Sequence, residues 1–326
     1  MSRRRPNGPR PPASWNALRW VFGKSQPPAL RGRTMDHDIL HMRLTIWLTI
    51  ATLCAVIVFA AFPFLDLRIS SLFFNGQAGD WVGRSPDFMF WRDVLRHGGE
   101  AFAVVTFLIF LGNVLIGTKQ QTGWRVWAFI WGNTLACAGL LVNGILKTWL
   151  GRARPDGVIE FGGFQTFTPA FQLSNQCFKN CSFSSGEAAL VASVVLPVCV
   201  LLWPQLPRSG KVVCTVIAAF LITATAAMRM AAGRHFLSDT TMSILFAALT
   251  SLILYRVLAI GQHRQVFTVR PVVTDVRAIL NYSRIYARRW LVMLVRKGVK
   301  TVIDLRAWAA KAKMWPSQRH SNVAVD

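Results

Sequence analysis

Six uncharged, apolar runs mark out the middle of this 326-residue chain, and they constrain its fold more than any other feature. They cover residues 44–65, 101–118, 126–146, 188–207, 212–228 and 240–255. An apolar helix needs about 20 residues to cross a bilayer, so we expect the last two runs to include flanking residues. With 53% hydrophobic and 16% charged residues, the chain is too apolar for an ordinary soluble domain. We predict an all-α, polytopic membrane protein with six transmembrane helices.

Three regions follow from this pattern of apolar runs. Residues 1–42 are rich in Arg and Pro and hold no apolar stretch long enough for a secretory signal, so we predict a disordered basic tail. Residues 43–258 hold the six-helix core. Residues 259–326 interleave basic and apolar side chains, which is typical of an amphipathic helix lying on a leaflet of anionic lipid headgroups. A solvated charged helix is the alternative for this last region.

The net charge of +23 could suggest a nucleic-acid partner, but its placement follows membrane topology instead. Six crossings put both ends of the chain on one side, and these ends hold most of the 37 Lys and Arg residues. The positive-inside rule assigns that side to the cytoplasm. The loops 66–100, 147–187 and 229–239 then share the opposite face. We predict cytoplasmic termini and no nucleic-acid partner.

Polar clusters lie at span ends in these outward loops, and we expect the chemistry there. Their sequences are KTWLGRARP at 147–155, SFSSGE at 182–187 and RMAAGRHFLSD at 229–239. In the first cluster, Lys147 and Arg154 are seven residues apart, about two helical turns, so we expect both to project from one helix face. Arg152 is expected to point elsewhere. Two cations at a span mouth suit a multiply charged anion such as phosphate. Anchoring of the helix at the lipid headgroups is the alternative.

The second cluster opens the fourth span. Ser185 and Gly186 lie at a helix start, whose free N–H groups form a ready anion site, and Gly186 would let the backbone approach a ligand closely. Glu187 lies in the first turn, where it pairs favourably with the helix dipole. Its alternative role is that of a carboxyl with a raised pKa that donates a proton to a leaving oxygen.

In the third cluster, His235 and Asp239 are four residues apart, on one face of the helix that we expect to begin the sixth span. An Asp that accepts from one imidazole nitrogen leaves the other nitrogen free as a nucleophile or base. Arg229 adds a third cation on the same side of the membrane. A structural histidine near the membrane surface is the alternative. We predict no metal site, because zinc needs several close His or Cys ligands and that face has only His97 and His235 as histidines.

These residues resemble the three motifs of the type 2 phosphatidic acid phosphatase superfamily, K-x6-RP, PSGH and SR-x5-H-x3-D. The motif order, the gaps and the six spans agree over about residues 43–258. The resemblance implies a helical core like that of the vanadium haloperoxidases, and metal-independent hydrolysis of a lipid phosphate without a cofactor. It implies phosphate-binding roles for Lys147, Arg154, Ser185, Gly186 and Arg229. It further implies that His235 attacks phosphorus to form a phosphohistidine and that Asp239 orients His235.

The chain departs from the family motifs at three positions. Ser184 stands in place of Pro, Met228 in place of the Ser before Arg, and Glu187 in place of the His that usually protonates the leaving group. Glu187 is either a replacement general acid or a change that slows or redirects the reaction. The SGE form is similar to a bacterial branch of lipid phosphatases that includes lipid A 1-phosphatase-like proteins. This branch implies an inner-membrane protein with a periplasmic active site.

Cys177 and Cys181 lie in an outward loop just ahead of the second cluster. We predict that they form a disulfide in the periplasm, next to Ser185. Two free thiols are the alternative, since a gap of three residues permits a bridge without requiring it.

From these observations we predict an integral-membrane lipid phosphatase that acts on a phosphomonoester or diphosphate of a headgroup. Two other functions fit the same residues. One is a lipid-phosphate binding or translocating protein in which the altered second motif has abolished turnover. The other is a lipid phosphotransferase whose acceptor is not water. The sequence indicates neither the oligomeric state nor which lipid phosphate is the substrate.

Overall fold

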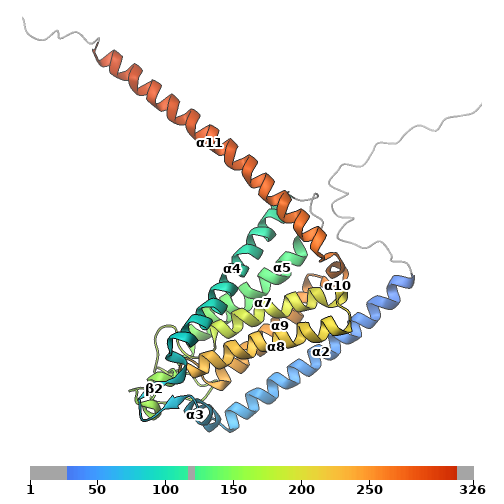
Figure 1. Cartoon of the computed structure of the whole chain (residues 1–326), viewed down its shortest axis with the longest axis vertical. Helices are drawn as coiled ribbons and strands as arrows, with labels where there is room; N and C mark the ends of the chain where they lie inside the picture. Colours follow the sequence, from blue (N-terminus) through green and yellow to red (C-terminus); the bar gives the residue numbers. More distant parts are fainter. Residues whose placement is uncertain (1–27, 117–121, 314–326) are drawn as a thin grey trace, which may run out of the picture.

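The computed structural model describes residues 28–116 and 122–313, and helices make up most of this part of the chain (Figure 1). Within these residues, six helices are long and apolar enough to cross a membrane. They cover Ile39–Ala61, Pro86–Leu115, Trp124–Trp149, Gly186–Gln205, Arg208–Ala231 and Leu237–Val257. The predicted all-α, six-span membrane fold is confirmed.

Most elements belong to the spans or to their short connections. In chain order the α-helices are α2 (Pro28–Ala61), α3 (Phe64–Ser71), α4 (Pro86–Ile116), α5 (Trp124–Asn133), α6 (Lys147–Trp149), α7 (Gly186–Leu202), α8 (Arg208–Ala231), α9 (Leu237–Val257), α10 (Ile260–His263) and α11 (Val269–Lys313). Between them lie the strands β1 (Phe74–Asn75) and β2 (Asp80–Trp81), the π-helix η3 (Thr134–Leu146), and the 3₁₀ helices η1 (Val82–Arg84), η4 (Pro155–Gly157), η5 (Ile159–Phe161), η6 (Trp203–Gln205) and η7 (Arg264–Val266).

The helix α7 is central to the bundle, because it packs against α4, α5, α8, α9 and the π-helix η3. Its sequence explains this position. Ala188, Ala189, Ala192 and Ser193 are fully buried, and small side chains let neighbouring membrane helices approach closely. Since α7 begins with the second polar cluster, this packing also fixes the position of that cluster relative to the other spans.

Two helices extend beyond the apolar runs that predicted them. α2 begins at Pro28 and so reaches into the stretch that we predicted as a disordered tail, whereas residues 1–27 of that tail lie outside the described part of the chain. α4 begins at Pro86, so residues 86–100, which we assigned to an outward loop, form its first turns. This extension brings charged side chains of α4 alongside the polar clusters.

Both helix-face predictions for the clusters are wrong in detail. The helix that carries Lys147 ends at Trp149, and Arg154 has an extended backbone with φ −85° and ψ 157°. Gly151 turns the chain with φ +63°, and a Cβ there would lie 1.7 Å from the backbone oxygen of Ser174, so only glycine fits. Likewise α9 begins at Leu237, after His235. Loops, rather than helix faces, therefore bring these residues together.

The C-terminal helix α11 lies at the end of the bundle away from α3 and β2, and it runs across the direction of the spans (Figure 1). Its first turns are anchored to the bundle. Asp275 accepts hydrogen bonds from the backbone nitrogen and the hydroxyl of Thr122, and Ile279 packs against Gly112 of α4. Beyond these contacts, residues 286–310 are exposed.

Candidate active site

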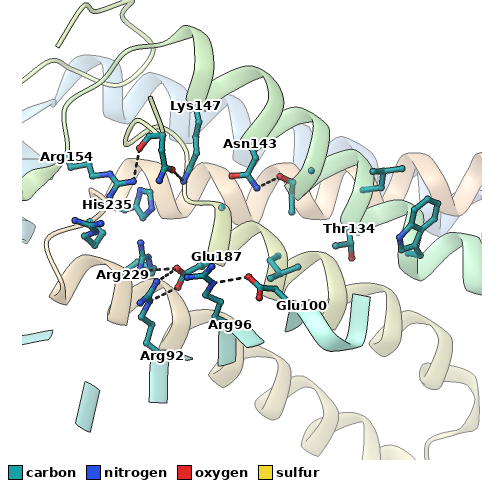
Figure 2. Close-up of a pocket in the computed structure, with 18 residues that line it drawn as sticks. Arg92, Arg96, Glu100, Thr134, Asn143, Lys147, Arg154, Glu187, Arg229 and His235 are labelled. Atoms are coloured by element: carbon teal, nitrogen blue, oxygen red, sulfur yellow. Dashed lines mark hydrogen bonds and ion pairs between the residues drawn. The ribbon is translucent and has the colours of Figure 1, made fainter. Parts of the chain in front are cut away.

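The polar clusters meet at a cavity of about 540 Å³ (Figure 2). They lie at the end of the bundle that holds α3 and β2 (Figure 1). The charged lining of the cavity consists of six basic and two acidic residues: Arg92, Arg96, Lys147, Arg154, Arg229 and Arg234, with Glu100 and Glu187. Part of the wall is apolar, with Trp131, Leu135, Ala138 and Leu190. An anion attached to an apolar tail suits this combination.

Six of the residues predicted from the sequence line this cavity: Lys147, Arg154, Gly186, Glu187, Arg229 and His235. Figure 2 shows Lys147, Arg154 and His235 on one side, facing Glu187 with Arg92 and Arg229 on the other. Asp239 and Ser185 are fully buried and do not contribute to the lining among the described residues. The clusters thus converge although up to about ninety residues of chain separate them.

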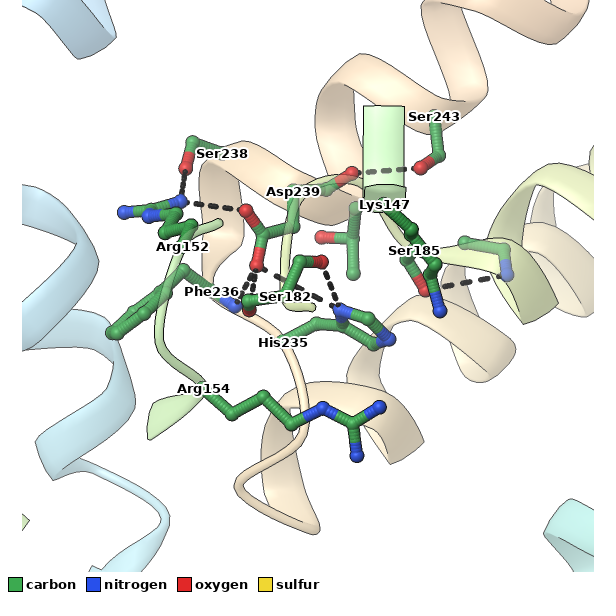
Figure 3. Close-up of polar contacts among 12 residues, drawn as sticks. Lys147, Arg152, Arg154, Ser182, Ser185, His235, Phe236, Ser238, Asp239 and Ser243 are labelled. Carbon is green, nitrogen blue, oxygen red and sulfur yellow. Dashed lines mark hydrogen bonds and ion pairs between the residues drawn. The ribbon is translucent and has the colours of Figure 1, made fainter. Parts of the chain in front are cut away.

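His235 is held by a backbone carbonyl. Its Nδ1 lies 2.7 Å from the carbonyl oxygen of Ser182, and because a carbonyl only accepts, Nδ1 carries the proton and donates. The carboxylate of Asp239 is farther from Nδ1, at 3.7 Å. Our prediction that Asp239 itself accepts from the ring is therefore corrected, since Ser182 fixes the tautomer. The lone pair remains on Nε2, which Figure 3 shows between the ends of Lys147 and Arg154.

Asp239 acts on His235 through Ser182. One carboxylate oxygen of Asp239 accepts from the Ser182 hydroxyl at 2.5 Å and from the Phe236 backbone nitrogen at 2.9 Å (Figure 3). The other accepts from Arg152 at 2.6 Å. With three donors, the carboxylate has a fixed orientation, and it fixes Ser182 and the residue that follows His235.

Arg152 is a buried residue whose role the sequence did not reveal. Its side chain is 1% exposed and bridges Asp239 to Asp66, which accepts from it at 2.8 Å. The guanidinium carbon also lies 4.3 Å from the ring centroid of Phe236, a cation–π distance. Burial raises the pKa of the Asp66 carboxyl, although Arg152 opposes that shift. Arg152 does point away from Lys147 as we predicted, but it supports the third cluster.

The environment of His235 favours a neutral imidazole. Burial lowers the pKa of His235 to about 3, and the nearby cations Arg229 and Lys147 act in the same direction. The contact with Asp239 raises this pKa but does not compensate for burial. A neutral ring with its proton on Nδ1 has an available lone pair on Nε2, as a nucleophile requires.

Glu187 is paired with two arginines. It accepts from Arg92 through two hydrogen bonds, at 2.7 and 3.2 Å, and lies 3.2 Å from Arg229. Two guanidinium groups stabilise the charged carboxylate, whereas a general acid must carry a proton. These contacts argue against the general-acid role, which stays a prediction, and indicate that Glu187 orients Arg229.

Ser185 and Gly186 have different roles from each other. Ser185 is the N-cap of α7, and its hydroxyl accepts from the Ala188 backbone nitrogen at 3.4 Å. Its hydroxyl is therefore a capping group, and its contact with phosphate stays a prediction. Gly186 lines the cavity, and a Cβ there would lie 2.7 Å from the side-chain oxygen of Asn143.

Sequence reasoning missed several residues of the cavity, above all Arg92 and Arg96. The repeat Arg92, Arg96, Glu100 has the i, i+4 spacing of one helix face, and Arg96 pairs with Glu100 at 2.9 Å. That spacing was the available signal, but these residues precede the apolar run and were therefore assigned to a loop. Asn180 was missed too, since a loop asparagine carries no pattern.

Cys177 and Cys181 form a disulfide bond, with Cα atoms 5.5 Å apart. The bridge closes a short loop immediately before Ser182, so it lies beside the backbone group that holds His235.

In comparisons with known proteins, one family model matches a part of the chain that includes all three clusters. Residues 127–260 match the model of the PAP2 superfamily. A lipid A 4′-phosphatase of Francisella tularensis subsp. novicida (strain U112) is 30% identical over 203 residues, which cover 62% of this chain and 89% of that protein. A lipid A 4′-phosphatase of Rhizobium leguminosarum is 33% identical over 232 residues, covering 64% of this chain and 94% of that protein. A solved transmembrane PAP2 type phosphatidylglycerolphosphate phosphatase from Bacillus subtilis aligns at 22% identity with a TM-score of 0.40, covering 68% of this chain and 95% of that one.

Proposed function

The chain belongs to the PAP2 superfamily of membrane lipid phosphatases, and we propose that it removes the 4′-phosphate of lipid A at the periplasmic face of a bacterial inner membrane. Two relatives support this substrate, because both are lipid A 4′-phosphatases and both are covered over most of their length. The 4′ position differs from the lipid A 1-phosphatase-like branch to which the SGE motif pointed.

The observation that carries the hydrolase mechanism is the protonation state and orientation of the His235 ring. A neutral imidazole whose Nδ1 is engaged by Ser182 directs its Nε2 lone pair toward the place where three cations converge. These are Lys147, Arg154 and Arg229. A nucleophile next to a cationic anion-binding site is the arrangement that phosphoryl transfer needs.

In the first step the three cations bind the phosphoryl oxygens and stabilise the charge that develops in the transition state. Nε2 of His235 forms a bond to phosphorus while the bond between phosphorus and the lipid oxygen breaks. The departing oxygen takes a proton from water, because Glu187 is engaged by Arg92 and Arg229.

In the second step water attacks the phosphorus of the phosphohistidine. The N–P bond breaks, His235 returns to its neutral form, and inorganic phosphate leaves. Each step uses only this chain's own groups and water, so we propose a metal-independent hydrolysis.

The apolar wall of the cavity suits the lipid part of the substrate. It is formed by Trp131, Leu135 and Ala138 with Leu190, which come from α5, η3 and α7. These helices are membrane spans, so lipid can reach the phosphate site laterally from the leaflet.

The helix α11 supports the proposed orientation. Its exposed part carries Arg288, Arg289, Arg296, Lys297 and Lys300 around a shallow pocket, alongside apolar side chains. We propose that this helix lies on the anionic cytoplasmic leaflet, which puts the cavity at the opposite, periplasmic end. A reporter fused after Asp326 should therefore behave as cytoplasmic, and periplasmic reporter activity would overturn this orientation.

The substrate proposal is tested by measuring the phosphate that purified protein releases from each lipid, with and without EDTA. Lipid A should be hydrolysed faster than phosphatidic acid, phosphatidylglycerophosphate or undecaprenyl diphosphate, and mass spectrometry should locate the loss at the 4′ position. Faster release from another lipid would contradict the substrate, and inhibition by EDTA would contradict metal independence. No release from any lipid would favour the binding or translocating alternative, and a phosphorylated lipid acceptor would favour the transferase.

A further inference from the structure

The loop closed by the disulfide contacts two of the cations of the first cluster, Lys147 and Arg154. Within this loop, the side-chain oxygen of Asn180 accepts from Nζ of Lys147 at 3.1 Å. The backbone oxygen of the same residue accepts from the guanidinium of Arg154 at 2.7 Å. Asn180 thus contacts two cations whose backbones differ. Lys147 lies near the end of a helix, and Arg154 lies in an extended segment.

The conformation of Asn180 makes this double contact possible. Its φ is +55°, in the left-handed region that Asn tolerates better than most residues. In this geometry both its carbonyl and its amide oxygen reach the cations. The residue also lines the cavity, so it acts where the substrate phosphate is proposed to bind.

The loop is fastened on both sides to the segment that carries the cations. The disulfide joins Cys177 to Cys181. Before it, the Ser174 backbone nitrogen donates to the Leu150 carbonyl at 2.9 Å, and after it the Ser182 nitrogen donates to the Arg152 carbonyl at 3.0 Å. Since the Ser182 carbonyl also accepts from His235, one short loop ties the cations to the nucleophile.

The chemistry of an amide suits this position. Lys147 and Arg154 repel each other, and acceptors that face both of them hold them together. A lysine has three donors and an arginine five, so Asn180 leaves most of these donors for phosphate oxygens. An amide is also neutral, unlike a carboxylate, and does not cancel the charge that attracts phosphate.

We propose that Asn180, held in place by the Cys177–Cys181 disulfide, is a positioning residue that sets the distance between Lys147 and Arg154 for phosphate binding. The proposal rests on the phosphate-binding role assigned to those two cations under the proposed function. It predicts that changes at Asn180 act on phosphate affinity more than on the chemical step.

The test compares Asn180→Gly, Asn180→Asp and the double variant Cys177→Ser/Cys181→Ser with Lys179→Ala as the matched control. Glycine keeps the left-handed backbone and the carbonyl but removes the side-chain acceptor. Lys179 is an exposed neighbour in the same loop. We measure the Kd of inorganic phosphate by calorimetry, and KM and kcat for lipid A.

We expect Asn180→Gly and the double cysteine variant to raise the Kd and KM about tenfold with kcat within about threefold. Asn180→Asp should raise both further, because its carboxylate competes with phosphate, and Lys179→Ala should match the wild type. An unchanged Kd in Asn180→Gly, a loss in kcat alone, or an equal effect of Lys179→Ala would overturn the role of Asn180. An unchanged Kd in the cysteine variant would overturn the role of the disulfide. Wild-type protein that binds phosphate but releases none from any lipid would contradict the proposed function alone, because the Kd comparison still tests Asn180.

Discussion

Replacing His235 with alanine should lower phosphate release from lipid A by about four orders of magnitude, because it removes the proposed nucleophile on which both steps depend. The three cations proposed to bind phosphate remain, so the affinity for inorganic phosphate should change far less than turnover. The measurement is phosphate release in steady state. It is combined with rapid acid-free quenching and mass spectrometry, which should detect a phosphohistidine in the wild type and none in His235→Ala.

A matched control for this prediction is His97→Ala. His97 is the other histidine predicted on the outward side, and its side chain is 66% exposed and pairs with Glu100. This variant should keep its activity within about threefold of the wild type. Equal phosphate release by His235→Ala and the wild type, or a phosphoenzyme that persists in His235→Ala, would contradict the phosphohistidine mechanism.

The meeting of distant residues in one cavity could be predicted from the sequence, because it depends on topology. Counting six apolar runs and following the positive charges placed the three clusters on one face. Lys147, Arg154, Arg229 and His235 do line one cavity. Membrane spans make such arguments strong, since a helix of given length leaves few choices for where its ends lie.

The local geometry of the clusters could not be predicted in the same way. The spacing between their residues was interpreted as the spacing along a helix, but the helices do not continue through the clusters. The helix that carries Lys147 ends shortly before Gly151, whose φ is positive, and His235 precedes α9. Backbone groups then make the contacts that position the site residues. The Ser182 carbonyl holds the His235 ring, and any residue type at position 182 would supply that carbonyl.

The sequence also did not predict which side chains distant in the chain form ion pairs. Arg152 pairs with Asp66 and Asp239, each more than eighty residues away. No periodicity links such positions, and only the packed bundle brings them together. Arg92 was missed for a related reason, as the helix α4 continues past its apolar run into residues that read as a polar loop.

Glu187 is the position where sequence and structure give different roles, and the two roles make different kinetic predictions. A general acid protonates the leaving oxygen, so its loss should matter most for a poor leaving group and little for a good one. A residue that orients Arg229 serves the bound phosphoryl group itself, so its loss should matter for every leaving group. The contacts of Glu187 with Arg92 and Arg229 favour the second role.

Replacing Glu187 with glutamine should therefore lower kcat/KM by about 100-fold, both for lipid A and for an aryl phosphate with a good leaving group. Glutamine keeps the shape but not the charge, so Arg229 loses its ionic partner and repulsion from Arg92 is no longer offset. The double variant Arg92→Gln/Glu187→Gln should be no worse than Glu187→Gln alone, because the two residues act as a pair. Glu160→Gln, a change at an exposed carboxylate in the loop between the third and fourth spans, should leave both activities unchanged. A loss confined to lipid A, with normal turnover of the aryl phosphate, would contradict the positioning role and restore Glu187 as the proton donor.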